Sequence, residues 1–170
     1  MSRSILAALC CAVTLAACVS APAPQPTATP AASITLFEGG CYYMGSCTTY
    51  EMTVQADGTY RLDGQSMTRT EGISEGQLDA DAFAAADDAL SAADFASLPA
   101  AMNGSDRDVW DPDVYPCMNH APGVRITRRS ADGSERTVYW DQGCRSAQMS
   151  ALLDNLRTAF RYDDLVRPAQ

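Results

Sequence analysis

Two pairs of segments with period-two apolar alternation most constrain how this chain can fold. The first pair, residues 49–55 and 59–63, turns at Asp57-Gly58 and directs to one face Tyr50, Met52, Val54, Tyr60 and Leu62. The second pair, residues 124–129 and 135–140, flanks the turn Ser130-Ala131-Asp132-Gly133. Alternation of this kind is typical of half-buried strands, and Asp-Gly between such strands favours a hairpin. The chain therefore predicts two β-hairpins.

Two further segments have the period of amphipathic helices. Residues 78–90 direct inward Leu78, Phe83, Ala86 and Leu90, and residues 146–160 carry the stripe Met149, Leu152, Leu153, Leu156 and Phe160. Additional strands are expected at residues 34–37 and 66–70. We therefore predict an α+β domain, with an antiparallel sheet of about five to six strands and two main helices packed on one face.

The N-terminus has the charge and length of a secretory signal. Arg3 precedes an apolar run that ends at Ala17, and this run is shorter than the roughly 20 residues of a membrane-spanning helix. The residues Leu15-Ala16-Ala17-Cys18 resemble the lipobox of bacterial lipoproteins. We predict a signal peptide over residues 1–17 and lipidation of Cys18, with acyl chains that anchor the protein to a membrane. The alternative is an ordinary signal peptide with a chance cysteine.

Residues 18–33 are expected to be a tether between the lipid and the domain. The stretch after Cys18 is uncharged and rich in alanine and proline, so it cannot bury a core and favours extended geometry. The domain is then expected over residues 34–170. Val19 stands where an aspartate retains enterobacterial lipoproteins in the inner membrane, so we expect an outer-membrane protein that faces the periplasm.

Four cysteines lie in the expected domain: Cys41, Cys47, Cys117 and Cys144. An even number in an oxidising compartment indicates disulfides. Cys117 and Cys144 lie almost equally far from the second hairpin turn, so the hairpin would bring them together. We pair these two, and Cys41 and Cys47 would then close a small local loop.

The charge of the chain argues against a nucleic-acid partner. Loss of Arg3 with the signal leaves 11 basic residues, all arginine, against 21 acidic ones, a net charge of −10. Nucleic acid and anionic lipid head groups both require a basic surface. The acidity permits a cationic partner or a metal ion, or it serves solubility alone.

Two possible metal sites can be read from the sequence. Two Asp-x-Asp pairs lie in one polar loop: Asp106, Asp108, Asp111 and Asp113. Alternating carboxylates suit calcium, but the EF-hand order is missing, so we expect a solvated acidic loop and no cofactor. Cys117 and His120 have a spacing that suits zinc or a thiol nucleophile with its base. In an oxidising compartment the disulfide is the better interpretation.

Aromatic loop residues and the single histidine are the expected partner contacts: Tyr42, Tyr43, Trp110, Tyr115 and His120. Trp140 is expected in the core or half-buried in its strand. Four arginines cluster on the second hairpin: Arg125, Arg128, Arg129 and Arg136. They would either contact a polyanion or protect an edge strand from aggregation.

Short motifs recur in an order typical of one family. The layout begins with a strand at Ile34-Thr35-Leu36. A loop between two cysteines, a strand that begins near a tyrosine, an Asp-Gly-Thr turn and a helix that ends in a Phe-x-x-Leu-Pro pattern then follow. The matching residues are Cys41, Gly45, Cys47, Tyr50, Asp57, Gly58, Thr59, Phe95, Leu98 and Pro99. Over residues 34–160 this layout resembles a bacterial family described only as a domain of unknown function, found in small secreted and lipid-anchored proteins. The chain departs from it by five residues between Cys41 and Cys47, where three are usual, and by the added Cys117 and Cys144. The resemblance implies a fold and no catalytic residue.

No catalytic motif of the common hydrolase, phosphate-loop or metalloprotease types occurs in the sequence. We therefore expect a lipid-anchored, non-catalytic module that binds an envelope protein or cell-wall partner through loops at residues 41–47 and 103–120. One alternative is an inhibitor of a cationic envelope hydrolase such as lysozyme. The other is a carboxylate-dependent hydrolase.

Overall fold

The computed structural model describes residues 30–40, 47–103, 117 and 121–168. Its elements, in chain order, are β1 (Ala31–Gly39), β2 (Thr49–Gln55), β3 (Thr59–Ser66), β4 (Gly72–Gln77), α1 (Ala82–Ala92), β5 (Ala101–Met102), β6 (Gly123–Ser130), β7 (Glu135–Asp141), α2 (Ala147–Ala159) and α3 (Tyr162–Leu165). Within these ranges, none of the helices has the length and hydropathy needed to cross a membrane.

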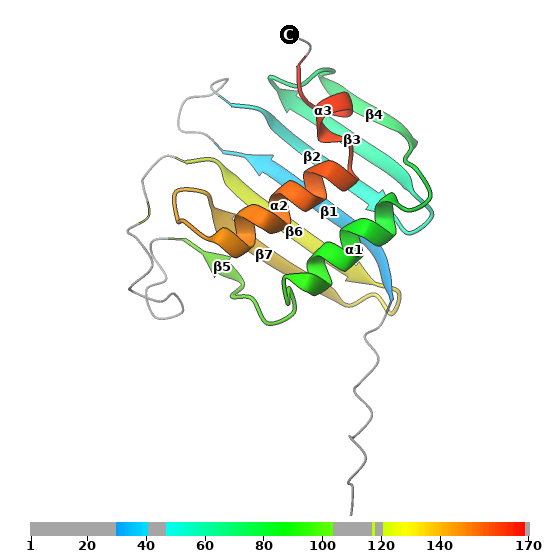
Figure 1. Ribbon diagram of the computed structural model, residues 1–170. Coiled ribbons are helices and arrows are strands. Elements are labelled where there is room, and N and C mark those ends of the chain that lie inside the picture. The colour runs from blue at the N-terminus through cyan, green and yellow to red at the C-terminus, as the bar shows by residue number, and fades with distance from the viewer. Residues whose placement is uncertain (1–29, 41–46, 104–116, 118–120, 169–170) are drawn as a thin grey trace, which may run out of the picture.

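A single seven-stranded sheet has the order β4-β3-β2-β1-β6-β7-β5. Helices α1 and α2 lie side by side on one face of it (Figure 1). The α+β class and the two main helices on one face are thus confirmed. The expected count of five to six strands is wrong, and the sheet is not wholly antiparallel, because the two-residue β5 pairs parallel with β7.

Both predicted hairpins are present. β2 pairs with β3 around Asp57-Gly58, and β6 pairs with β7 around residues 131–134. The strand expected at residues 66–70 is wrong, because β3 itself extends to Ser66 and the next strand is Gly72–Gln77. This strand is the exposed edge of the sheet, so it needs no alternation of apolar residues.

The first helix begins later than expected. Leu78 is buried, but its backbone N–H donates to the carbonyl of Gly58 at 3.0 Å, so it belongs to the loop that packs on the first hairpin. The helix starts at Ala82 after Asp81. The second helix starts where expected, because the hydroxyl of Ser146 accepts a hydrogen bond from the N–H of Met149 and caps it.

The first strand begins at Ala31, inside the segment assigned to the tether (residues 18–33). Ala31 pairs with Ser130, and Ser33 pairs with Gln55 on the other side. This segment forms a strand because it pairs with β6 and β2, and it has no alternating apolar pattern that would predict one. The carbonyl of Pro30 also accepts the N–H of Ala131. The chain therefore enters the domain beside the β6–β7 turn.

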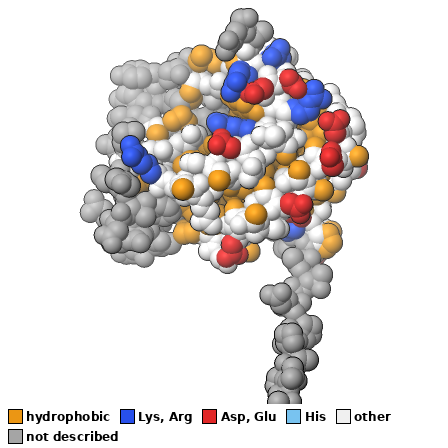
Figure 2. All heavy atoms as spheres, in the orientation of Figure 1, with side chains coloured by type: hydrophobic (Ala, Val, Ile, Leu, Met, Phe, Trp, Pro, Cys, Tyr) orange, Lys and Arg blue, Asp and Glu red, His pale blue; other side chains and the backbone are white. Residues whose placement is uncertain are grey.

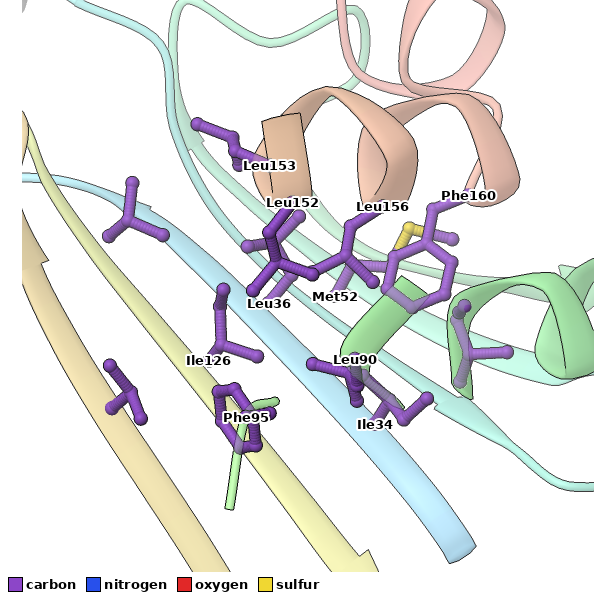
Figure 3. Packing of buried hydrophobic residues seen from close by; sticks show 14 of the residues in the cluster. Ile34, Leu36, Met52, Leu90, Phe95, Ile126, Leu152, Leu153, Leu156 and Phe160 are labelled. Atoms are coloured by element: carbon purple, nitrogen blue, oxygen red, sulfur yellow. The ribbon is translucent and has the colours of Figure 1, made fainter. Parts of the chain in front are cut away.

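The core lies between the two helices and the sheet face beneath them. All five residues of the predicted α2 stripe are buried, and Figure 3 shows Leu152 and Leu156 directed at Leu36, Met52 and Ile126 of three neighbouring strands. Helix α1 buries Phe83, Ala86 and Leu90 against the same cluster. Each strand thus presents one face to the helices. The opposite face, here called the outer face, carries no helix in the described residues.

Candidate functional site

Different segments of the chain adjoin the two ends of the sheet. At one end, here called the loop end, Gly39 pairs with Gly123, and Gly123 pairs with Asp141. The segments that leave β1 and enter β6 therefore start from this end. The chain's entry at Pro30 lies at the opposite end. The described ends of β1 and β6 that adjoin the predicted contact loops therefore lie at the end of the sheet opposite Pro30.

Most of the predicted site residues lie outside the described residues. These are Cys18, Cys41, Tyr42, Tyr43, Asp106, Asp108, Trp110, Asp111, Asp113, Tyr115 and His120. Their predicted roles in lipidation, calcium binding and partner contact stay predictions. Among the residues that are described, no three His, Cys, Asp or Glu side chains gather as metal ligands would.

A disulfide joins Cys117 to Cys144 beside the loop end, as the hairpin predicts. In this bonded state Cys117 is neither a zinc thiolate nor a free nucleophile. Trp140 is buried, as expected, and its indole N–H donates to the carbonyl of Cys144 at 2.7 Å. Cys47 is also disulfide-bonded. Since Cys41 lies outside the described residues, its pairing with Cys47 stays a prediction.

The arginines of the second hairpin do not form one cluster. Arg128 points to the helix face and pairs with Asp87 of α1 at 2.7 Å. Arg136 also lies on the helix-side register and donates to the carbonyl of Leu98. Arg125 and Arg129 lie on the outer face. Edge protection is the wrong explanation for the three arginines of β6, because that strand lies between β1 and β7. It stays open for Arg136, because β5 pairs with β7 only at Tyr139 and Trp140.

A buried ionic cluster joins β1, β2 and α2. Glu38 is 5% exposed, and both its oxygens accept from Arg157, whose Nε lies 3.0 Å away. The hydroxyl of Tyr50 donates to the same carboxylate. Arg157 also lies over the ring of Tyr162, which packs against Tyr50. All partners of Glu38 come from the protein itself, so this cluster clamps α2 to the sheet.

This clamp was missed from the sequence, although a signal for it exists. Glu38 follows Ile34 and Leu36 at the inward spacing of β1. Arg157 lies one turn after the buried Leu153 of α2. A charged residue in a core register indicates a buried partner, because an unpaired charge there would be costly.

Burial, with the nearby charge of Glu38, raises the pKa of Tyr50 well above its ordinary value. In the unfolded chain Tyr50 would lose its proton near pH 10. The folded state holds the proton to higher pH, so its stability is complete below pH 10 and falls as the pH rises further.

We therefore expect unfolding free energy to fall above about pH 10 by about 1.4 kcal/mol per pH unit for this proton. Tyr50→Phe should remove that part of the slope, which urea titrations between pH 8 and 11 would measure. The raised pKa of Tyr139 contributes equally to the pH dependence of the unmodified protein and of Tyr50→Phe, so it cancels in the comparison. Equal slopes in the two proteins would contradict the assignment.

A cavity of about 440 Å³ opens on the surface around α3. Figure 2 shows basic and acidic side chains gathered there. Three arginines and three aspartates line it: Arg157, Arg161, Arg167, Asp154, Asp163 and Asp164. The carboxylates are 62–76% exposed, and each pairs with an arginine. A general acid needs a shielded carboxyl group, so these exposed pairs are unsuited to acid–base chemistry.

Two aligned rows of side chains cross the outer face over β2, β1, β6 and β7. The first, here called the aromatic row, consists of Glu51, Phe37, Arg125 and Tyr139. The second, the threonine row, consists of Thr53, Thr35, Thr127 and Thr137. The aromatic row lies nearer the loop end. Neither row was expected from the sequence, because the alignment depends on the distant pairing of β1 with β6.

The aromatic row is held by its own contacts. The guanidinium of Arg125 lies over the Phe37 ring, 4.9 Å from its centroid, and reaches Glu51 at 2.8 Å. The ring of Tyr139 lies against Gly123, where an added Cβ would be 2.7 Å from the tyrosine hydroxyl. Only glycine leaves room for this ring to lie along the strand. Tyr139 is nevertheless 37% exposed.

Comparison with known proteins extends the sequence resemblance. None of the curated proteins matches the chain. A family described as "Domain of unknown function (DUF6438)" matches residues 32–160. The match begins at the second residue of β1 and ends just after α2, so it includes part or all of every strand and both main helices. Because the match covers most of the chain, this protein belongs to the DUF6438 family.

Proposed function

We propose that this protein is a lipid-anchored component of the bacterial cell envelope, and that its domain binds a partner on the outer face without catalysis. The observation that carries the proposal is the pair of aligned rows on that face. Both main helices pack on the other side, so these side chains are free to meet a partner. A binding role needs such an ordered, accessible surface.

The position of the rows supports a role at a membrane. Residues 18–30 would span about 40 Å if extended, at roughly 3.1 Å per residue. They would join the domain at Pro30, beside the β6–β7 turn. The aromatic row lies towards the opposite end of the strands, so a lipid on Cys18 would attach to the domain at the end remote from this row.

The charged groups of the described residues favour binding over hydrolysis. The carboxylates that line the cavity around α3 are exposed and paired, and the buried Glu38 is bound by Arg157 and Tyr50 and does not line that cavity. Neither arrangement leaves a shielded acid beside an open cavity. The outer face offers fixed donors, acceptors and aromatic rings instead.

The binding face can be tested by photo-crosslinking in living cells. A photoreactive residue at position 137 lies on the outer face, and one at position 151 lies on the exposed side of α2 and serves as the matched control. We expect an adduct at 137 that Tyr139→Ala weakens, and none at 151. Absence of an adduct at 137 in abundant protein, or equal adducts at both positions, would contradict the proposed face.

The anchor needs a separate test. Cells fed an alkyne-labelled fatty acid should incorporate it into the protein, and the Cys18→Ala variant should lose the label and leave the membrane fraction. Cys47→Ala is the matched cysteine control and should keep both properties. A labelled Cys18→Ala protein would overturn lipidation at this residue.

A further inference from the structure

Across β2, β1, β6 and β7, the outer face offers many hydrogen-bonding groups, and both of its arginines are paired with carboxylates. Arg125 pairs with Glu51, and Arg129 pairs with Glu135 at 3.3 Å. A polyanion needs unpaired basic groups, and the whole chain carries a net charge of −9. Paired charges of this kind suit an uncharged ligand, because guanidinium and carboxylate groups can exchange hydrogen bonds with hydroxyl groups.

The face also contains an exposed ring at a fixed position. One side of the Tyr139 ring lies against Gly123. Tyr139 is nevertheless 37% exposed, so part of its ring is accessible to solvent. A flat ring held in this way can stack on a flat, weakly polar surface such as one side of a sugar ring. Arg125, the cross-strand neighbour of Tyr139, directs its guanidinium away from this ring, over Phe37 to Glu51, so its hydrogen-bond donors lie further along the row.

The dimensions favour an elongated ligand. Each row crosses four adjacent strands, a length of roughly 14 Å at about 4.8 Å per strand. The threonine row runs parallel to the aromatic row and roughly 7 Å from it. Its hydroxyls form two pairs, Thr35 with Thr53 and Thr127 with Thr137, both at 2.9 Å. Each hydroxyl keeps a lone pair for a further donor.

We propose that the aromatic and threonine rows bind an extended, uncharged polysaccharide chain that lies across β2, β1, β6 and β7. One sugar ring stacks on Tyr139, and sugar hydroxyls replace water on Arg125, Glu51 and the threonines. The proposal rests on the function proposed above, because it names the class of ligand for the same face.

Binding can be measured calorimetrically with the full chain, purified in a detergent without a sugar head group. The probes are β-1,4-linked hexamers of glucose and of N-acetylglucosamine, with an oligogalacturonate as the anionic control. We expect an uncharged hexamer to bind, and Tyr139→Ala to weaken it about tenfold. Ile73→Ala removes an exposed apolar side chain from β4, in line with the aromatic row but two strands beyond Glu51 and outside the proposed site, and should leave the affinity unchanged.

Gly123→Ala provides a second variant that keeps Tyr139. The added methyl group would displace the ring, so affinity should again fall while the fold persists. Failure of both uncharged hexamers to bind, or tighter binding of the oligogalacturonate, would overturn the polysaccharide proposal. If the adduct at position 137 persisted in that case, the binding face would stand and only the ligand class would fall. Loss of the adduct as well would overturn both.

Discussion

Replacement of Arg157 by methionine is expected to cost the domain about 3–5 kcal/mol of unfolding free energy. The change leaves the buried carboxylate of Glu38 without its cationic partner, while the hydroxyl of Tyr50 alone cannot neutralise it. This is a large part of the 5–15 kcal/mol that stabilises a typical domain. Urea unfolding followed by circular dichroism would measure the loss.

Two further variants distinguish the loss of the Glu38–Arg157 pair from the loss of any charged side chain. Arg167→Met breaks the exposed pair with Asp163 and should cost less than about 1 kcal/mol. The double change Glu38→Leu with Arg157→Met removes both charges and should be much milder than Arg157→Met alone. This double variant keeps the prediction testable if the single variant does not fold. Equal losses for Arg157→Met and Arg167→Met would contradict a clamp at Glu38.

Removal of the Cys117–Cys144 disulfide is expected to cost about 3.5 kcal/mol by the loop-entropy relation, since the bridge spans a sequence separation of 27. The double change Cys117→Ala with Cys144→Ala should also increase the urea m-value, because the unfolded chain becomes less compact. An unchanged m-value would show that the bridge does not restrict the unfolded state.

Peptide mapping without reductant tests the pairing itself. The peptide with Cys117 should be joined to the one with Cys144, and the peptides with Cys41 and Cys47 should be joined to each other. A link between either of the first two and either of the second two would contradict the pairing.

The sequence could predict those elements that bury one face of a regular pattern. The two hairpins and α2 were found because their apolar residues repeat with a period of two or 3.6. Leu78 matches the helical pattern as well as Phe83 does, so the start of α1 was misplaced. The apolar pattern indicates which side chains are buried, but it cannot indicate that the backbone N–H of Leu78 donates to the carbonyl of Gly58.

The missed elements carry no such pattern. β4 has the sequence GISEGQ and is almost wholly exposed, so only its ladder with β3 makes it a strand. β5 has two residues, and Ala31 pairs with the remote Ser130. The outer rows depend on the same remote pairing, which aligns Phe37 with Arg125. Periodicity along one segment cannot give the register between two distant ones.

The central position of β1 determines when this domain can finish folding. The strands β1 to β4 follow one another in sequence and pair as neighbours, so they can assemble early from local contacts. The second edge of β1 is filled only by β6, and α2 covers the core later still. A chain that leaves a ribosome or a translocation channel N-terminus first therefore completes its sheet near the end of its passage. The sheet of β1 to β4 can therefore form early, whereas the complete sheet and its covered core require the chain as far as the end of α2.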